Sequence, residues 1–150
     1  MIPIQATKTV IVVAPQLKDN GDFAGLAPVD VMGWGHARFL FITGTCDAAI
    51  GSTAEGTAPK IEECDTTDGT YTDITSAALS DAIAATEDDS LFAIDIDLTK
   101  SHKRYMQPDA PHAGDGTTGC NMCIICILSK PEGERPVDAT GQGLAELINA

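Results

Sequence analysis

The stretch Leu91-Phe92-Ala93-Ile94-Asp95-Ile96-Asp97-Leu98 alternates with a period of two over eight residues, and it decides the fold class. Successive side chains of an extended strand point to opposite faces. Phe92, Ile94, Ile96 and Leu98 would share one face, and Leu91, Ala93, Asp95 and Asp97 the other. The pattern predicts a β-strand that buries the first set in a core and whose other face meets water at its far end, at Asp95 and Asp97.

The other apolar runs are also of strand length rather than helix length. They are Thr9–Val13, Ala37–Thr43, Lys60–Cys64 and Met122–Leu128, with a more polar strand expected over Ser101–Gln107. The run Met122–Leu128 is almost wholly apolar, which is typical of a strand buried on both faces or lying at an interface. Polar turns are expected at Lys18–Asp22 and Asp65–Thr70, and a turn or bulge beside Trp34, which glycines flank.

Two segments have a helical spacing of apolar residues. Ile74–Ala85 suits one or two helical turns, or equally a loop that connects strands, and Leu144, Leu147 and Ile148 suit a short terminal helix. Several short strands without strand–helix alternation favour an all-β fold, a β-sandwich of jelly-roll type. We expect residues 1–136 to form this single domain and residues 137–150 to form a tail or short helix.

The charge balance of the 150-residue chain is strongly acidic. Twenty-two acidic residues face nine basic ones, for a formal net charge of −13. Such a surface repels phosphate backbones, so direct binding of nucleic acid is not expected. No apolar run approaches the ~18–20 residues of a membrane span, and the first residues lack the pattern of a signal peptide. We expect neither a membrane partner nor export by that route.

Three of the five cysteines lie close together in the sequence. Cys120, Cys123 and Cys126 have the Cys-x-x-Cys-x-x-Cys spacing found in iron–sulfur proteins, and Cys46 or Cys64 would complete a set of four. In a strand, however, Cys123 would point away from the other two. The three are therefore weak metal candidates, and buried free thiols are the favoured interpretation. A disulfide that involves Cys46 or Cys64 remains open.

The other titratable residues form no known catalytic motif. His36, His102 and His112 lack zinc-hydrolase spacing, and His36 is interpreted as a residue at a strand entry. Asp95 and Asp97 would share a strand face, where paired carboxylates bind calcium or hydrolyse glycosides, or where they are simply a charged surface. Nucleophile elbows, phosphate-binding loops and dinucleotide fingerprints are missing from the sequence. We expect no catalytic residues and no cofactor.

The basic residues Lys100, Lys103 and Arg104 form the main positive cluster of the chain, beside His102. One interpretation is charge balance against Asp95 and Asp97 on the neighbouring strand. The other is a docking patch, and we predict that Lys100, Lys103 and Arg104 contact an acidic partner surface.

The order of several short motifs resembles a known family. These motifs are Ala14-Pro15-Gln16, Val29-Asp30-Val31-Met32-Gly33-Trp34-Gly35-His36-Ala37-Arg38-Phe39 running into Thr43-Gly44, Ile61-Glu62-Glu63-Cys64-Asp65, Tyr71-Thr72-Asp73-Ile74, Ile94-Asp95-Ile96-Asp97-Leu98, Lys103-Arg104-Tyr105-Met106 and Leu128-Ser129-Lys130-Pro131. Together they resemble the head decoration (capsid cement) proteins of tailed bacteriophages. The resemblance covers roughly residues 8–131, whereas the cysteine cluster and the C-terminal tail depart from the family pattern.

The resemblance implies a non-enzymatic virion protein that stabilises a phage capsid by binding between subunits of the major capsid protein. It implies a homo-oligomer, usually a trimer, on the outer capsid surface of the virion, assembled in the host cytoplasm. An alternative is a small metal-binding or redox module built on Cys120, Cys123 and Cys126. Another is a carbohydrate-binding or hydrolytic β-sandwich that uses Asp95 and Asp97, although seven aromatic residues offer little for sugar stacking.

Overall fold

The computed structural model describes residues 6–19, 23–51, 58–110, 117–133 and 141–145. Within these ranges the chain forms β-strands and no helix. The eight strands are β1 (Thr7–Lys18), β2 (Val29–Asp30), β3 (Trp34–Cys46), β4 (Lys60–Cys64), β5 (Thr72–Ala78), β6 (Leu91–Asp97), β7 (Tyr105–Asp109) and β8 (Cys120–Pro131). The all-β prediction is therefore confirmed.

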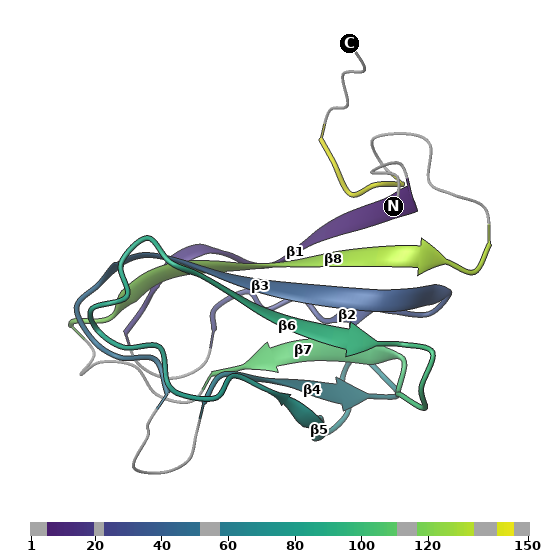
Figure 1. Ribbon diagram of the computed structural model, residues 1–150, viewed down its shortest axis with the longest axis horizontal. Coiled ribbons are helices and arrows are strands. Elements are labelled where there is room, and N and C mark those ends of the chain that lie inside the picture. The colour runs from purple at the N-terminus through teal and green to yellow at the C-terminus, as the bar shows by residue number, and fades with distance from the viewer. Residues whose placement is uncertain (1–5, 20–22, 52–57, 111–116, 134–140, 146–150) are drawn as a thin grey trace.

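The strands form two antiparallel sheets. The first sheet has the order β1-β8-β3-β6, and the second has the order β2-β7-β4-β5. In Figure 1 the strands of the first sheet follow one another from the top of the picture, and β7, β4 and β5 lie below them. Buried side chains from both sheets form a single hydrophobic cluster, so the core lies between the two layers.

The face prediction for the deciding stretch is confirmed. Ile94, Ile96 and Leu98 are buried and Phe92 is half-buried against the core, whereas Asp95 on the opposite face is exposed. The same alternation governs β8, whose inward residues are Cys120, Met122, Ile124, Cys126 and Leu128. Because the outward residues of β8 are only partly covered, one face of this strand is core and the other is open to a neighbour.

Two segments differ from their predicted structure. The first part of Ile74–Ala85 belongs to strand β5, where Thr72 and Ile74 favour extended backbone, and the rest is irregular. The strand expected over Ser101–Gln107 instead begins at Tyr105 and continues through Pro108. Proline is tolerated there because β2 pairs only with the first two residues of β7, which leaves no bonding partner on that side of Pro108.

Lys18 is a further correction, because it is not part of an exposed turn. It ends β1 with 2% of its surface exposed, and its ammonium lies 4.8 Å from the centre of the Phe23 ring. A lysine stem packs readily against apolar neighbours while its charge is stabilised over an aromatic face. The local sequence, which is rich in turn-forming residues, does not reveal this packing.

The described part of the C-terminal tail, residues 141–145, is a turn rather than a helix. The carbonyl of Gln142 accepts a hydrogen bond from the backbone N–H of Thr9 at 2.7 Å. Gly143 has a φ of +75°, and a Cβ there would collide with the Thr9 carbonyl, so only glycine fits. The remaining positions of the expected helix lie outside the described residues, and the domain boundary at residue 136 stays a prediction.

Candidate functional site

The outward-pointing residues of the first sheet form a surface that we call the outer face. Its members alternate with the core residues along all four strands. They are Thr9, Ile11, His36, Arg38, Leu40, Ile42, Leu91, Ala93, Asp95, Asp97, Cys123, Ile125, Ile127 and Ser129. The strand registers place these residues in rows that run across the sheet.

The middle rows of the outer face are apolar. One row runs Ile11–Ile125–Leu40–Ala93 through directly paired positions, and the next joins Cys123, Ile42 and Leu91. The apolar patch consists of Ile11, Leu40, Ile42, Leu91, Ala93, Cys123, Ile125 and Ile127. Ile11 and Leu91, at its two margins, are 64% and 63% exposed. The patch residues Leu40, Ile42, Cys123, Ile125 and Ile127 are half-buried, so the patch is contiguous and partly exposed, and it is a candidate surface for binding another molecule.

A shallow depression of about 390 Å³ extends the apolar patch along the sheet. Pro15, Ile42, Gly44 and Cys123 are among the residues that line it. Gly44 contributes no side chain, so the sheet surface is low at this point. The outer face therefore offers both a flat apolar area and a hollow beside it.

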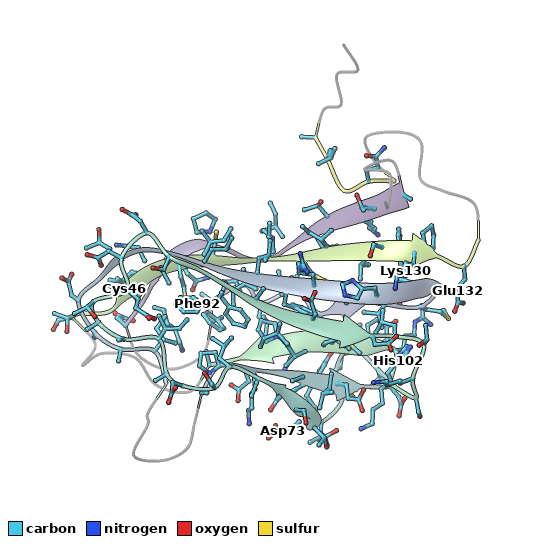
Figure 2. The ribbon with its side chains drawn as sticks, in the orientation of Figure 1. Cys46, Asp73, Phe92, His102, Lys130 and Glu132 are labelled. Atoms are coloured by element: carbon cyan, nitrogen blue, oxygen red, sulfur yellow. A yellow bond between two sulfur atoms is a disulfide. The ribbon has the colours of Figure 1, made fainter. Side chains whose placement is uncertain are left out.

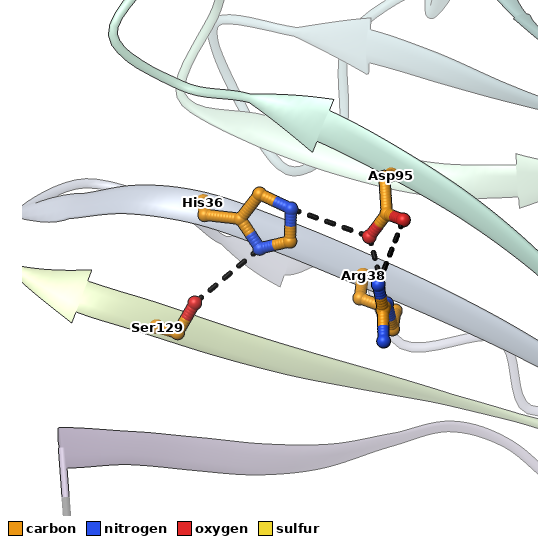
Figure 3. Close-up of polar contacts among 4 residues, drawn as sticks. All are labelled: His36, Arg38, Asp95 and Ser129. Carbon is orange, nitrogen blue, oxygen red and sulfur yellow. Dashed lines mark hydrogen bonds and ion pairs between the residues drawn. The ribbon is translucent and has the colours of Figure 1, made fainter. Parts of the chain in front are cut away.

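Four polar residues from three strands meet at the other end of the outer face (Figure 3). Arg38 donates to both carboxylate oxygens of Asp95, at 2.7 Å and 2.9 Å. His36 Nε2 lies 3.2 Å from Asp95 Oδ1, and its Nδ1 lies 3.3 Å from the hydroxyl of Ser129. The cluster thereby connects β6, β3 and β8 side by side.

The charges of this cluster neutralise one another. The hydrogen bonds from Arg38 hold the pKa of Asp95 below its ordinary value, against the effect of partial burial. Asp95 in turn raises the pKa of Arg38, so both groups keep their charge over a wide pH range. Asp97 pairs with the Thr99 hydroxyl at 2.6 Å. Arg38 therefore cancels the charge of Asp95, whereas Asp97, whose partner is a neutral hydroxyl, keeps its negative charge.

Ser129, His36 and Asp95 are hydrogen-bonded in the same order as the catalytic triad of a serine hydrolase, but their surroundings do not suit catalysis. Ser129 is only 6% exposed, so a substrate carbonyl has no approach to its hydroxyl. Arg38 occupies both oxygens of Asp95 and weakens it as a partner for a protonated histidine. We interpret the cluster as a polar connection between strands. Sequence reasoning missed it because its members lie far apart in the chain.

The outer face of the second sheet is charged instead of apolar. Lys60 lies 2.8 Å from Asp73, 3.4 Å from Asp109 and 3.7 Å from Glu62. Burial and the neighbouring Asp109 raise the pKa of Glu62, whereas the hydrogen bond from Lys60 lowers the pKa of Asp73. Such a surface is well solvated. The two outer faces of the molecule are therefore chemically unlike, and that of the first sheet is the more apolar one.

The cysteines do not converge on a common point. Cys46 of β3 and Cys120 of β8 form a disulfide. The sequence had left open whether Cys46 or Cys64 takes part in such a bond. Cys126 is buried, and burial raises the pKa of its thiol to about 12. Cys123 points to the outer face, as strand alternation predicted. In the described residues, which include all five cysteines, no three potential ligands are grouped for a metal ion.

The basic residues named from the sequence make contacts within the chain. Arg104 forms a two-pronged pair with Asp30, closest at 2.7 Å, and lowers the pKa of that carboxyl. The Lys103 ammonium donates to the Thr72 hydroxyl at 2.9 Å. His102 and Cys46 lie toward opposite ends of the molecule (Figure 2), so this basic cluster is remote from the disulfide. Its docking role stays a prediction.

Comparison of the chain with protein-family models, with curated proteins and with solved structures found no match. The part of the chain that the structure describes contains no helix long and apolar enough to cross a membrane. Functional inference therefore depends on the geometry of the chain itself.

Proposed function

We propose that the protein is a non-enzymatic structural subunit of a virion. It decorates the outer surface of a tailed-phage head and stabilises it by binding between major capsid protein subunits. The observation that carries this proposal is the apolar patch on the outer face of the first sheet. Contiguous apolar patches on a protein surface are often functional, and contact with neighbouring subunits in an assembly would bury this one.

The size of the apolar patch suits a contact within an assembly. Each of the eight patch residues occupies about 4.8 Å by 6.8 Å of the sheet surface, which gives roughly 260 Å² in all. Removing that area from water would contribute on the order of 6 kcal/mol before the cost of association is subtracted. One such contact is modest, but a decoration subunit makes several around a symmetric particle, and the contributions reinforce one another.

The pairing scheme of the strands supports a jelly-roll β-sandwich as the finer description of the fold. β1 pairs with β8, β2 with β7, β3 with β6, and β4 with β5. This is the scheme of one long antiparallel hairpin rolled into two facing sheets. Jelly rolls occur in viral capsid proteins, but a fold alone does not specify a function. The jelly-roll scheme is therefore consistent with a capsid role, for which the apolar patch remains the main support.

We further propose that the subunit acts as a homo-oligomer, a trimer, as the family resemblance implies. Apolar burial supplies most of the binding energy in this scheme, and Lys100, Lys103 and Arg104 add weak ion pairs near the capsid contact. Because Arg104 is already paired with Asp30, Lys100 and Lys103 are the better candidates to meet carboxylates of the capsid.

The experiment uses phage particles purified from a lysate of the host cells in which this protein is produced. An antibody detects the protein across a density gradient. We expect it to sediment with intact heads at a fixed ratio to the major capsid protein. The variants Leu40→Asp and Ile125→Asp should lose this association, because each buries a carboxylate in an apolar contact. Met32→Asp is the matched control, since Met32 is 59% exposed but lies in the turn between β2 and β3.

Two results would overturn the proposal. One is a protein that stays at the top of the gradient while the heads sediment. The other is normal particle occupancy for both patch variants, each verified as folded by circular dichroism, because the apolar patch would then play no part in assembly.

A further inference from the structure

Three of the four sheet edges are protected against pairing with another strand. β1 has two register shifts, and its Val12 carbonyl accepts a bond from Ala27 N while its Thr9 N–H bonds to Gln142. β2 is only two residues long. On β5, four residues bulge between the pairs Lys60–Ala78 and Glu62–Asp73, and Ser76 adopts a φ of 68°. Short strands, bulges and covering segments are the usual ways to block an edge.

Within the part of the chain that the structure describes, strand β6 has none of these three protections. All seven of its residues pair in unbroken register with His36–Ile42 of β3. It is the last strand in the order of the first sheet, and Figure 1 shows it at the margin of that sheet. A regular edge of this length presents a row of backbone groups that a further strand can join.

The hydrogen-bond pattern shows which groups face outward. Next to β6, Leu98 N donates to Gly35 O, and Thr43 N donates to Ser90 O. In an antiparallel ladder, bonded and non-bonded pairs alternate, so the even-numbered residues of β6 bond to β3. The N–H and C=O groups of Leu91, Ala93 and Asp95 therefore point to the free side of the strand.

Space is available beside this edge. A groove of about 450 Å³ lies between β6 and β5, lined among others by Ser76, Asp97 and Lys100. The bulge of β5 keeps that strand from closing over the groove. An extended segment laid along β6 would continue the first sheet and border the groove.

We propose that the free edge of β6 accepts an extended segment of a partner protein as a fifth, antiparallel strand of the first sheet. The side chains of the outer face define its chemistry. Apolar residues fit opposite Leu91 and Ala93, a small polar residue fits opposite Asp95, whose two oxygens Arg38 occupies, and lysine or arginine fits opposite Asp97. A second copy of β6 in full antiparallel register would place Asp97 opposite Leu91 and Asp95 opposite Ala93, so each carboxylate would face an apolar residue instead of a cation.

The proposal goes beyond the decoration function and is tested on the isolated protein, so its outcome is independent of the gradient experiment. The probe is the synthetic peptide Lys-Thr-Ser-Thr-Val-Thr-Val, acetylated and amidated, whose antiparallel register places the lysine opposite Asp97, the serine opposite Asp95 and each valine opposite an apolar residue. Amide hydrogen exchange of the protein is followed by NMR with and without the peptide.

The peptide should change hydrogen exchange only at alternate amides of β6. The amides of Phe92, Ile94 and Ile96 are protected in the free protein, whereas those of Ala93 and Asp95 exchange quickly. Saturating peptide should slow exchange at Ala93 and Asp95 at least tenfold. A peptide with glutamate in place of lysine should bind at least tenfold more weakly.

The variant Ala93→Pro removes one outward N–H at a position where an edge strand tolerates proline. It should weaken peptide binding at least tenfold, and Ala93→Val, which keeps the N–H, should not. No binding at millimolar peptide would overturn the proposal, and so would binding without protection at Ala93 and Asp95. The exchange measurement on the unaltered chain decides the matter even if the proline variant does not fold.

Discussion

Adjacent isoleucines of β8 provide a matched test of the two faces of the first sheet. Ile124 is fully buried in the core, whereas Ile125 is half-buried on the outer face. The change Ile124→Ala removes three carbon atoms, which costs about 2.4 kcal/mol at ~0.8 kcal/mol each. A residual cavity of roughly 60 Å³ adds about 1.5 kcal/mol at ~24 cal/mol per Å³. We expect a total loss of about 4 kcal/mol.

The same truncation at Ile125 leaves no closed cavity and uncovers little new surface. We expect it to lower the free energy of unfolding of the dilute protein by about 1 kcal/mol or less. Urea unfolding followed by fluorescence measures both variants, since Trp34 is the only tryptophan and packs at the edge of the core. For a chain of this size, the Ile124 variant should also melt about 8–16 °C lower.

Equal losses for the two variants in dilute, monomeric protein would refute the register of β8 and with it the assignment of the outer face. If the loss at Ile125 instead grows with protein concentration, that residue is buried in an assembly and the patch argument gains support.

Three other predictions concern the disulfide, the acid response and the basic cluster. Reduction of the disulfide, which joins residues 74 positions apart, should lower the free energy of unfolding by about 4 kcal/mol, measured by urea titration with and without reductant. Arg38 lowers the pKa of Asp95, so the Arg38–Asp95 pair stabilises the folded state. This contribution is complete above the ordinary pKa of 3.8 and disappears as the pH falls through the lower pKa of the folded protein. The urea midpoint should therefore decline less steeply below pH ~4 in Arg38→Gln than in the natural chain. Charge reversal at Lys100 and Lys103 together should reduce particle occupancy more than reversal at the exposed Lys130, and unchanged occupancy would return the cluster to charge balance.

The all-β class and the faces of the clearest strand follow from local sequence alone. Alternation of side chains with a period of two is a local property of extended backbone, so the stretch from Leu91 to Leu98 carries its own evidence. The same reasoning placed Cys123 opposite Cys120 and Cys126 before any contact was known. Hydrophobic alternation is informative because burial of one apolar face in a shared core offsets the conformational entropy that each strand loses when it is ordered.

Tertiary structure decided everything that depends on pairing between distant residues. The Cys46–Cys120 disulfide arises only because β3 and β8 are neighbours, and so does the cluster of His36 with Asp95 and Ser129. Lys18 was expected in a turn because its neighbours favour turns, yet packing against Phe23 buries it. The order of strands in a sheet, and therefore which edge is left open, follows from the balance of all their contacts and not from any one segment.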